Sequence, residues 1–176
     1  PTRTTRGLIE PTIAELNDGS ILMVMRGSND ARPEWPAHKG VSRSGDGGMS
    51  WTDAEPWTYE DGHPFFSPSA CSQLIPHSNG KLYWMGNLTP ENPQGNRPRY
   101  PIVIGEVNLD SGCLMGETVT ILDDRQALDS DQVTLSNFYV REDQNGDLLL
   151  YLPRLFSGGE NDWTTDLMQY RIALKV

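Results

Sequence analysis

The sequence has few basic residues, few cysteines and no long apolar run. Its 176 residues contain 14 Lys and Arg against 24 Asp and Glu, which gives a formal net charge of -10. Nucleic-acid phosphates require a basic surface, so we expect no nucleic-acid partner. No stretch approaches the roughly 18 to 20 apolar residues that cross a bilayer, so we expect no membrane partner.

Potential metal ligands are also scarce. The two cysteines, Cys71 and Cys113, have no metal-binding spacing, and they could be small buried side chains, a disulfide or free thiols. His38, His63 and His77 lack the spacing of a ligand set as well, so we assign them to loops. The sequence therefore predicts no metal site and no cofactor.

The sequence also has almost no helical periodicity longer than two turns, and this lack indicates the fold class. The chain has 17 Gly and 13 Pro, which together with Asp and Asn interrupt it every few residues. Short apolar runs between such turn residues are typical of strands. We therefore predict an all-β protein.

The stretch from Glu10 to Arg26 is the clearest element. Apolar runs at 13–16 and 21–25 flank Asn-Asp-Gly, the strongest short-range signal for a tight β-hairpin. Antiparallel strands of similar length bring Glu10 and Arg26 to the same edge of a sheet. The pair could belong to a functional site or be an ordinary surface ion pair.

This hairpin is the first of three similar units. Gly19, Gly80 and Gly146 follow Asp or Asn at nearly even intervals, and each has an apolar run on both sides. Third strands follow at 41–44, 102–107 and 167–174. The repeat predicts β-propeller blades, each a four-stranded antiparallel sheet, and the competing architecture is a β-sandwich.

We expect about three blades, at residues 7–60, 64–124 and 130–176, with the outer strand of the third missing. That is half of a six-bladed ring. Closing the ring would cover the open edge, and the partner would be either the remaining propeller half or a second copy of the chain in a homodimer.

A turn motif follows the third strand of the first unit, at Ser44-x-Asp46-x-Gly48-x-x-Trp51. The aspartate can bond its own turn, glycine permits positive φ, and tryptophan packs against the fold. A degenerate copy begins at Asn108. The motif resembles the Asp box of the sialidase (neuraminidase) superfamily, whose members are β-propellers.

Two further segments carry the resemblance to sialidases. One segment resembles the part of sialidases that carries a catalytic glutamate and the second arginine of a triad. It consists of Glu10-Pro11, Glu15-Leu16-x-Asp18-Gly19 and the strand ending at Arg26. Arg99-Tyr100-Pro101-Ile102 resembles the segment with the third arginine, for which Arg97 is a weaker candidate. The resemblance implies that Arg26 and Arg99 hold a substrate carboxylate and that Glu10 polarises a tyrosine nucleophile.

The chain departs from the family where that tyrosine is expected. Ser136-Asn137 occupies the position, and Tyr139, two residues later, is the candidate nucleophile. Asn137 is then a candidate for substrate binding. The first arginine of the triad and the acidic aspartate belong to earlier blades in the family.

Several other side chains fall on the expected functional face. Trp35 could stack on a sugar or close over its own loop. Asp129 and Asp131 could form an acid/base pair, bind a cation or simply make an exposed polar turn. We assign the remaining tryptophans to packing: Trp51, Trp57, Trp84 and Trp163.

The resemblance implies an exo-acting glycoside hydrolase that removes terminal acidic sugars from glycans. The alternative is a carbohydrate-binding propeller that has kept the arginines and lost the nucleophile. Polysaccharide cleavage by other residues on the same scaffold is a third possibility, because fold does not determine function. By the same resemblance we expect a secreted or periplasmic protein whose partner is a glycan or an acidic sugar.

Overall fold

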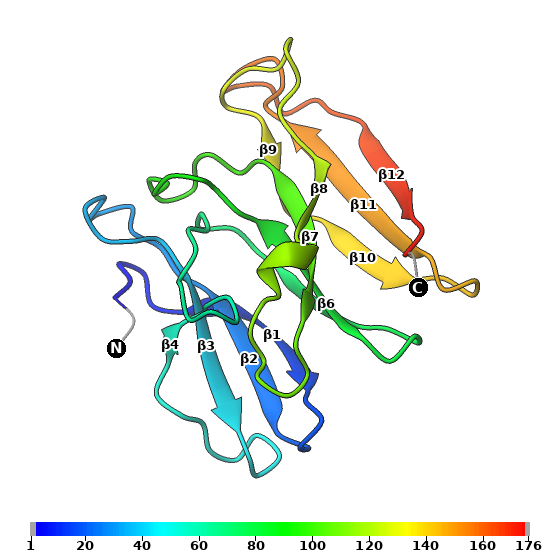
Figure 1. The fold of residues 1–176 in the computed structure, drawn as a ribbon. Helices are drawn as coiled ribbons and strands as arrows, with labels where there is room; N and C mark the ends of the chain where they lie inside the picture. The colour runs from blue at the N-terminus through cyan, green and yellow to red at the C-terminus, as the bar shows by residue number, and fades with distance from the viewer. Residues whose placement is uncertain (1–2, 175–176) are drawn as a thin grey trace.

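The computed structural model describes residues 3–174 as three four-stranded antiparallel sheets arranged like a fan (Figure 1). The first sheet has the order β1-β2-β3-β4. Its strands are β1 (Ile9–Glu15), β2 (Ile21–Arg26), β3 (Lys39–Ser44) and β4 (Glu55–Pro56). Strands that are consecutive in the chain lie side by side, as in a propeller blade.

The second sheet repeats this order with β5-β6-β7-β8. Its strands are β5 (Gln73–Pro76), β6 (Leu82–Asn87), β7 (Ile102–Val107) and β8 (Thr120–Asp123), and a short 3-10 helix, η1 (Gly116–Thr118), precedes β8. The predicted all-β propeller architecture is confirmed.

The third sheet differs at both edges. Its strands are β9 (Thr134–Leu135), β10 (Tyr139–Glu142), β11 (Leu148–Leu155) and β12 (Leu167–Ile172). β9 and β10 pair with successive parts of β11, and β12 pairs with β11 on its other side. Within residues 3–174, no strand covers the outer edge of β12. The blade limits given above stay predictions, and residues 175 and 176 of the third blade lie outside the described range.

The three hairpin turns form where the repeat predicted them. Gly19, Gly80 and Gly146 have φ of 79°, 82° and 81°, the left-handed region that glycine adopts without strain. In the first turn the Asp18 carboxylate accepts hydrogen bonds from the Ser20 backbone and hydroxyl. Local turn chemistry therefore sets the register of each hairpin.

Two apolar clusters join the three sheets. Leu22, Trp57 and Trp84 are buried between the first and second sheets, whereas Met85 and Leu150 belong to the cluster between the second and third. The packing role predicted for Trp57 and Trp84 is confirmed by their exposed fractions of 1% and 0%. The same prediction for Trp163 is wrong, because this side chain lies on a loop and is 71% exposed.

The inner strands β1, β5 and β10 adjoin one another across the blades. The Leu74 backbone donates to Thr12 Oγ1 at 2.9 Å, and Gln73 Nε2 donates to the Val140 carbonyl at 3.0 Å. These contacts align the blades, so the chain segments that enter β1, β5 and β10 meet at one end of the sheets.

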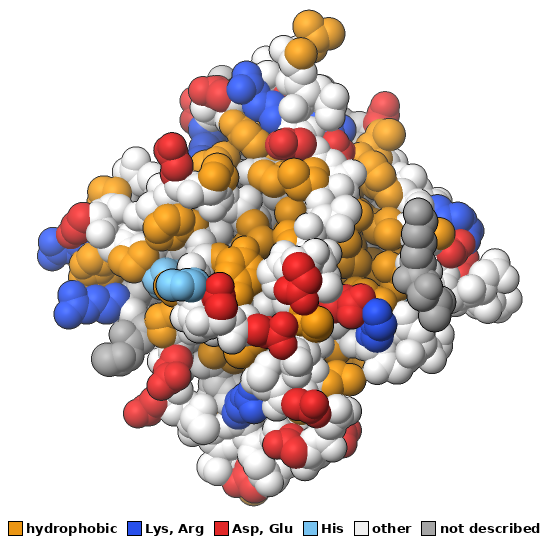
Figure 2. All heavy atoms as spheres, viewed as in Figure 1, with side chains coloured by type: hydrophobic (Ala, Val, Ile, Leu, Met, Phe, Trp, Pro, Cys, Tyr) orange, Lys and Arg blue, Asp and Glu red, His pale blue; other side chains and the backbone are white. Residues whose placement is uncertain are grey.

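The surface reflects the acidic composition. Figure 2 shows acidic side chains spread over the lower half of the face viewed, with apolar side chains through its middle. In the part of the chain that the structure describes, no helix has the length and apolar character needed to cross a membrane. Residues 3–174 also contain no cluster of three potential metal ligands.

Candidate functional site

Glu10 and Arg26 form an ion pair at the open end of the first hairpin. Their nearest atoms, Oε1 and Nη1, are 2.6 Å apart. Ile9 lies opposite Arg26, and the register shifts between Ile9 and Thr12. Glu10 occupies this irregularity with a φ of 52°. Bulges next to active sites re-aim side chains, and this one turns the Glu10 carboxylate toward Arg26.

Arg26 and Arg99 converge on Ser69 from neighbouring blades. Arg26 Nε donates to the Ser69 hydroxyl and Arg99 Nη2 to the Ser69 carbonyl, both at 2.7 Å. Only 13% of the Arg26 side chain is exposed. The predicted proximity of Glu10, Arg26 and Arg99 is therefore found, although the functional roles of the three residues stay predictions.

Arg99 has spare hydrogen-bonding capacity. Its Nε is buried and has no hydrogen-bond partner among the described residues. Burial lowers the pKa of Arg99, and the nearby Arg26 cation lowers it further. A buried donor without a partner is unfavourable. An anion placed beside the two guanidinium groups would pair with their charge.

Lys39 lies directly beneath this pair, and sequence reasoning missed it. It begins β3 opposite Arg26, its exposed fraction is 0%, and its Nζ donates to the Ala70 carbonyl. Burial lowers the pKa of Lys39 from 10.5 to about 7, with Arg26 and Arg99 adding to the effect and Cys71 and Glu10 opposing it. Nothing in the sequence around Lys39 distinguishes it from a surface lysine.

Cys71 is a second residue beside the cluster, and its place there was not predicted, although a free thiol was one of the alternatives for it. It is a half-buried free thiol next to Ala70, and its Sγ lies 3.9 Å from both Ser136 Oγ and Asn137 Oδ1. Cys113 is also free, which excludes a disulfide between the two. Cys71 therefore links the cationic cluster of Arg26, Lys39 and Arg99 to the third blade.

Asn137 stands where the nucleophile was expected, just before β10. It is exposed and has a φ of 57°. Glu10, Asn137 and Phe156 are the non-glycine residues with positive φ in the described chain, and all three flank this end of the sheets. Such strained residues cluster at functional sites.

Tyr139 lies on β10 opposite Tyr151 and is 57% exposed. Within residues 3–174, no hydrogen bond joins it to Glu10. Its role as a nucleophile stays a prediction.

Arg97 is more exposed than Arg26, and Trp35 is half-buried. The Arg97 side chain is 42% exposed, and its Nη2 lies 4.0 Å from Glu160 Oε1. The Trp35 ring has the guanidinium carbons of Arg3 and Arg32 within 5.8 and 5.9 Å of its centroid. Cations thus approach the Trp35 ring, and its assignment to sugar stacking stays a prediction.

Asn87 holds the backbone at Arg99 by hydrogen bonds. Its side chain is fully buried, and Nδ2 donates to the carbonyls of Arg99, Pro101 and Leu135 at 3.0 to 3.1 Å. This amide holds the backbone of Arg99 against both neighbouring strands. Asn87 is therefore a positioning residue for the cluster.

Asp129 is not part of an exposed polar turn. Both Asp123 and Asp129 form ion pairs with Arg154, and the Asp129 side chain is 12% exposed. Asp131 is exposed. The carboxylate of Asp129 thus orders the loop after β8, because Arg154 holds it to the end of β11.

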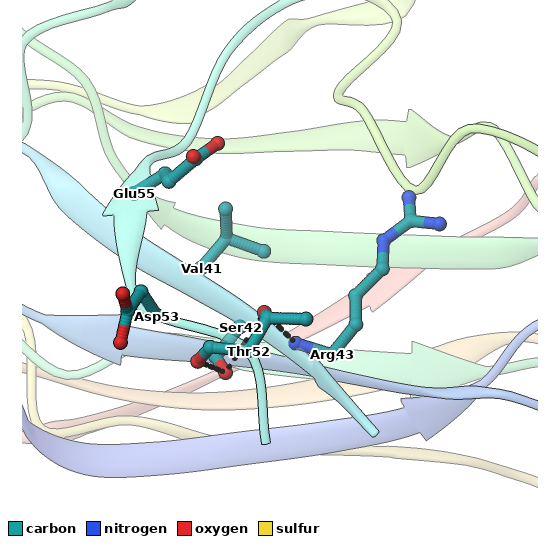
Figure 3. Close-up of a pocket in the computed structure, with 6 residues that line it drawn as sticks. All are labelled: Val41, Ser42, Arg43, Thr52, Asp53 and Glu55. Carbon is teal, nitrogen blue, oxygen red and sulfur yellow. Dashed lines mark hydrogen bonds between the residues drawn. The ribbon is translucent and has the colours of Figure 1, made fainter. Parts of the chain in front are cut away.

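A separate pocket of about 320 Å³ lies between β3 and β4 (Figure 3). Its walls include Arg43, Asp53 and Glu55, and the Arg43 side chain points away from both carboxylates. Residues 42 and 43 lie toward the Ser44 end of β3, opposite to Lys39. This pocket is therefore separate from the Arg26–Arg99 cluster.

Solved structures with the same arrangement of strands are propeller enzymes. A point mutant of the NanB sialidase from Streptococcus pneumoniae superposes with a TM-score of 0.59 and 17% identity, over 91% of this chain and 22% of that one. The intramolecular trans-sialidase from Ruminococcus gnavus gives 0.54 and 19%, over 97% and 34%. This chain has a sialidase-like fold.

A GH43_12 protein retrieved from a capybara gut metagenome gives a TM-score of 0.58 and 17% identity, over 94% of this chain and 28% of that one. No family model and no curated protein sequence matches the chain. The chain spans 22 to 34% of the length of these three solved structures. At such identities the similarity establishes the propeller fold alone.

Proposed function

We propose that this chain contributes the acidic-sugar-binding site of a sialidase-like, exo-acting glycoside hydrolase. The observation that carries the proposal is the convergence of Arg26 and Arg99 on Ser69, with Glu10 paired to Arg26 at 2.6 Å. Two guanidinium groups from adjacent blades present planar, fixed donors, which suit a carboxylate better than flexible ammonium groups do.

The charge balance of the cluster favours an anionic ligand. Arg26, Lys39 and Arg99 face one carboxylate, that of Glu10, in a protein whose net charge is -10. Burial is the main cause of the lowered pKa of Lys39 and of Arg99, and the neighbouring arginine cations add to it. A bound carboxylate would neutralise this repulsion.

Structural neighbours support an acidic sugar as the ligand. The Ruminococcus gnavus trans-sialidase was solved with oseltamivir carboxylate, and a leech intramolecular trans-sialidase was solved with 2,7-anhydro-Neu5Ac. Those ligands belong to those proteins. For this chain, Arg26 and Arg99 would take the carboxylate, and Glu10 would polarise the nucleophile, for which Tyr139 is the candidate.

Binding without hydrolysis is the second candidate function. By the family resemblance, Ser136-Asn137 occupies the position near which the tyrosine is expected. The exposed Tyr139 makes no hydrogen bond to Glu10 in the described chain. A site with the arginines and without a polarised nucleophile would retain acidic glycans and not cleave them.

The carboxylate clamp is tested by Arg99→Lys. We expect the affinity for N-acetylneuraminic acid, measured by calorimetry, to fall more than the affinity for lactose, because lysine keeps the charge and loses the planar donors. Arg141→Lys, at an exposed residue of β10, is the matched control. Equal changes for the acidic and the neutral sugar would show that Arg99 is structural.

The hydrolase is distinguished from the binder by release of N-acetylneuraminic acid from 3'-sialyllactose. If the protein is a hydrolase, the wild-type protein should cleave 3'-sialyllactose, and Glu10→Gln should bind this sugar without cleaving it. Turnover that survives Glu10→Gln would remove Glu10 from the chemistry. Binding with no turnover in the wild-type protein would establish the second candidate.

The outer edge of β12 would be covered in a closed ring, and we propose that the remaining propeller half or a second copy of this chain covers it. Light scattering distinguishes the two. A dimer mass supports the second copy, and a monomer mass removes it.

A further inference from the structure

A pocket of about 280 Å³ opens beside Arg99, between the second and third blades. Arg97, Arg99 and Asn137 give it polar walls, and Phe156 and Trp163 form an apolar wall. It shares Arg99 and Asn137 with the site described above and includes Phe156 and Trp163 of the loop after β11. A pocket with one aromatic wall and a few polar groups is typical of a small-molecule site.

Trp163 is the exposed member of this apolar wall. Its exposed fraction is 71%, and its ring meets that of Phe156 at 4.7 Å between centroids and 76° between planes. The edge-to-face contact holds one side of the indole and leaves much of the ring open. A large aromatic side chain that is exposed beside a pocket offers a flat surface to the C–H face of a sugar.

The loop that carries Trp163 is held by its own hydrogen bonds. Asp162 accepts from the Gly158 backbone at 2.9 Å and from Thr164 Oγ1 at 2.6 Å, while its carbonyl accepts from the Phe156 backbone at 3.1 Å. The Ser130 backbone also donates to the Ser157 carbonyl at 2.7 Å. Trp163 therefore sits on an ordered loop, which reduces the entropy lost on binding.

Backbone strain lies at the base of the same loop. Phe156 has a φ of 64°, a conformation that is unfavourable for an aromatic residue. Strain of this kind persists where the surrounding structure requires it, often at ligand sites. Here the strained backbone places the Phe156 ring beneath the indole of Trp163.

We infer that this pocket is a second sugar subsite, which takes the neutral hexose linked to the acidic sugar. The hexose stacks on Trp163 and its hydroxyl groups reach Arg97 and Asn137. The volume lies just below the roughly 300 to 1,000 Å³ typical of small-molecule sites, which fits one sugar ring better than a long chain. The inference rests on the proposed function, because it places the acidic sugar at Arg26 and Arg99.

Calorimetric titration with N-acetylneuraminic acid and with 3'-sialyllactose tests the subsite. The wild-type protein should bind the longer sugar about tenfold more tightly, in line with one aromatic contact. Trp163→Ala should remove that gain and leave the affinity for N-acetylneuraminic acid unchanged, and Trp163→Phe should keep part of it. Leu128→Ala, at another exposed apolar side chain (98% exposed), should change neither affinity.

The two proposals fail in different ways. Equal wild-type affinities for both sugars, or equal losses for both in Trp163→Ala, would overturn the subsite and leave the acidic-sugar site standing. Absence of N-acetylneuraminic acid binding by the wild-type protein would overturn the proposed function, and the subsite with it. Circular dichroism of each variant shows whether the fold is intact.

Discussion

The polar side chains at the two ends of β3 differ in how many hydrogen-bond partners they have. At one end, Ser44 and Asp46 bond within a single turn: Ser44 Oγ donates to Asp46 Oδ1 and accepts from the Gly48 backbone, both at 2.8 Å. Asp46 also accepts from the Ser50 backbone and hydroxyl. At the other end, Lys39 is fully buried, and its Nζ has one partner, the Ala70 carbonyl, in the described chain.

This difference separates a folding device from the proposed binding site. The Ser44 turn has satisfied its polar groups locally, so it has no capacity left for a ligand and stabilises its own conformation. The Lys39 end gathers cations from two blades and leaves the Arg99 Nε unpaired. Unsatisfied buried charge lowers stability, and it is retained where a ligand completes it.

The strongest test of this comparison is Arg26→Ala. We expect the affinity for N-acetylneuraminic acid to fall about 100-fold, because a charge-assisted contact is lost. The free energy of unfolding should fall by only about 1 kcal/mol, from loss of the bonds to Ser69 and Glu10. Calorimetry and urea unfolding measure the two. Unchanged affinity would mean that the cationic end of β3 has a structural role, as the Ser44 turn does.

Lys39→Met tests the instability predicted for the cationic end. The folded-state pKa of about 7 lies below the ordinary 10.5, so above pH 7 the unfolded chain binds more protons than the folded one. Wild-type stability from this group therefore rises with pH between these values and is lowest below pH 7.

Methionine removes that penalty, so Lys39→Met should be the more stable protein at pH 6, and its advantage should shrink by about 3 kcal/mol at pH 9. Urea unfolding at both pH values checks this. Lys81→Met is the control, because Lys81 is 45% exposed and pairs with Glu106. An advantage independent of pH would mean that Lys39 stays charged in the folded protein throughout this range.

Ser44→Ala is the complementary change at the other end of β3. It should lower the free energy of unfolding by about 1 to 2 kcal/mol, because buried hydrogen bonds of the turn are lost. Affinity for N-acetylneuraminic acid should stay at the wild-type value. Thr120→Ala, at an exposed hydroxyl, is the control for stability. Reduced affinity in Ser44→Ala would show that the Ser44 turn also contributes to binding.

Asp46→Asn should give the smallest effect. Hydrogen bonds from Ser50 and Ser44 lower the pKa of Asp46 from 3.8 to about 2. A lowered folded-state pKa means that the stabilisation is present above pH 3.8 and is lost as the pH falls through about 2. The variant should be less stable than the wild-type protein at pH 7, and the gap should narrow in acid. Chemical unfolding at both extremes measures it.

The sequence by itself determined the elements whose causes are local. The Asn-Asp-Gly hairpin, the repeat of the turn glycines and the ion pair of Glu10 with Arg26 all follow from turn chemistry and strand length, which neighbouring residues dictate. The approach of Arg99 was also predicted, although from a family resemblance and not from spacing.

Tertiary structure decided the rest, because burial depends on which blades meet. Lys39 and Cys71 have no local signal. Lys39 is buried where β3 meets the Ala70 segment that leads into β5, and Cys71 lies near Asn137 because the third blade adjoins the second. Trp163 looked like a core residue by type, yet the loop after β11 exposes it beside the pocket. Burial, and with it the pKa of Lys39, is a property of contacts between distant segments.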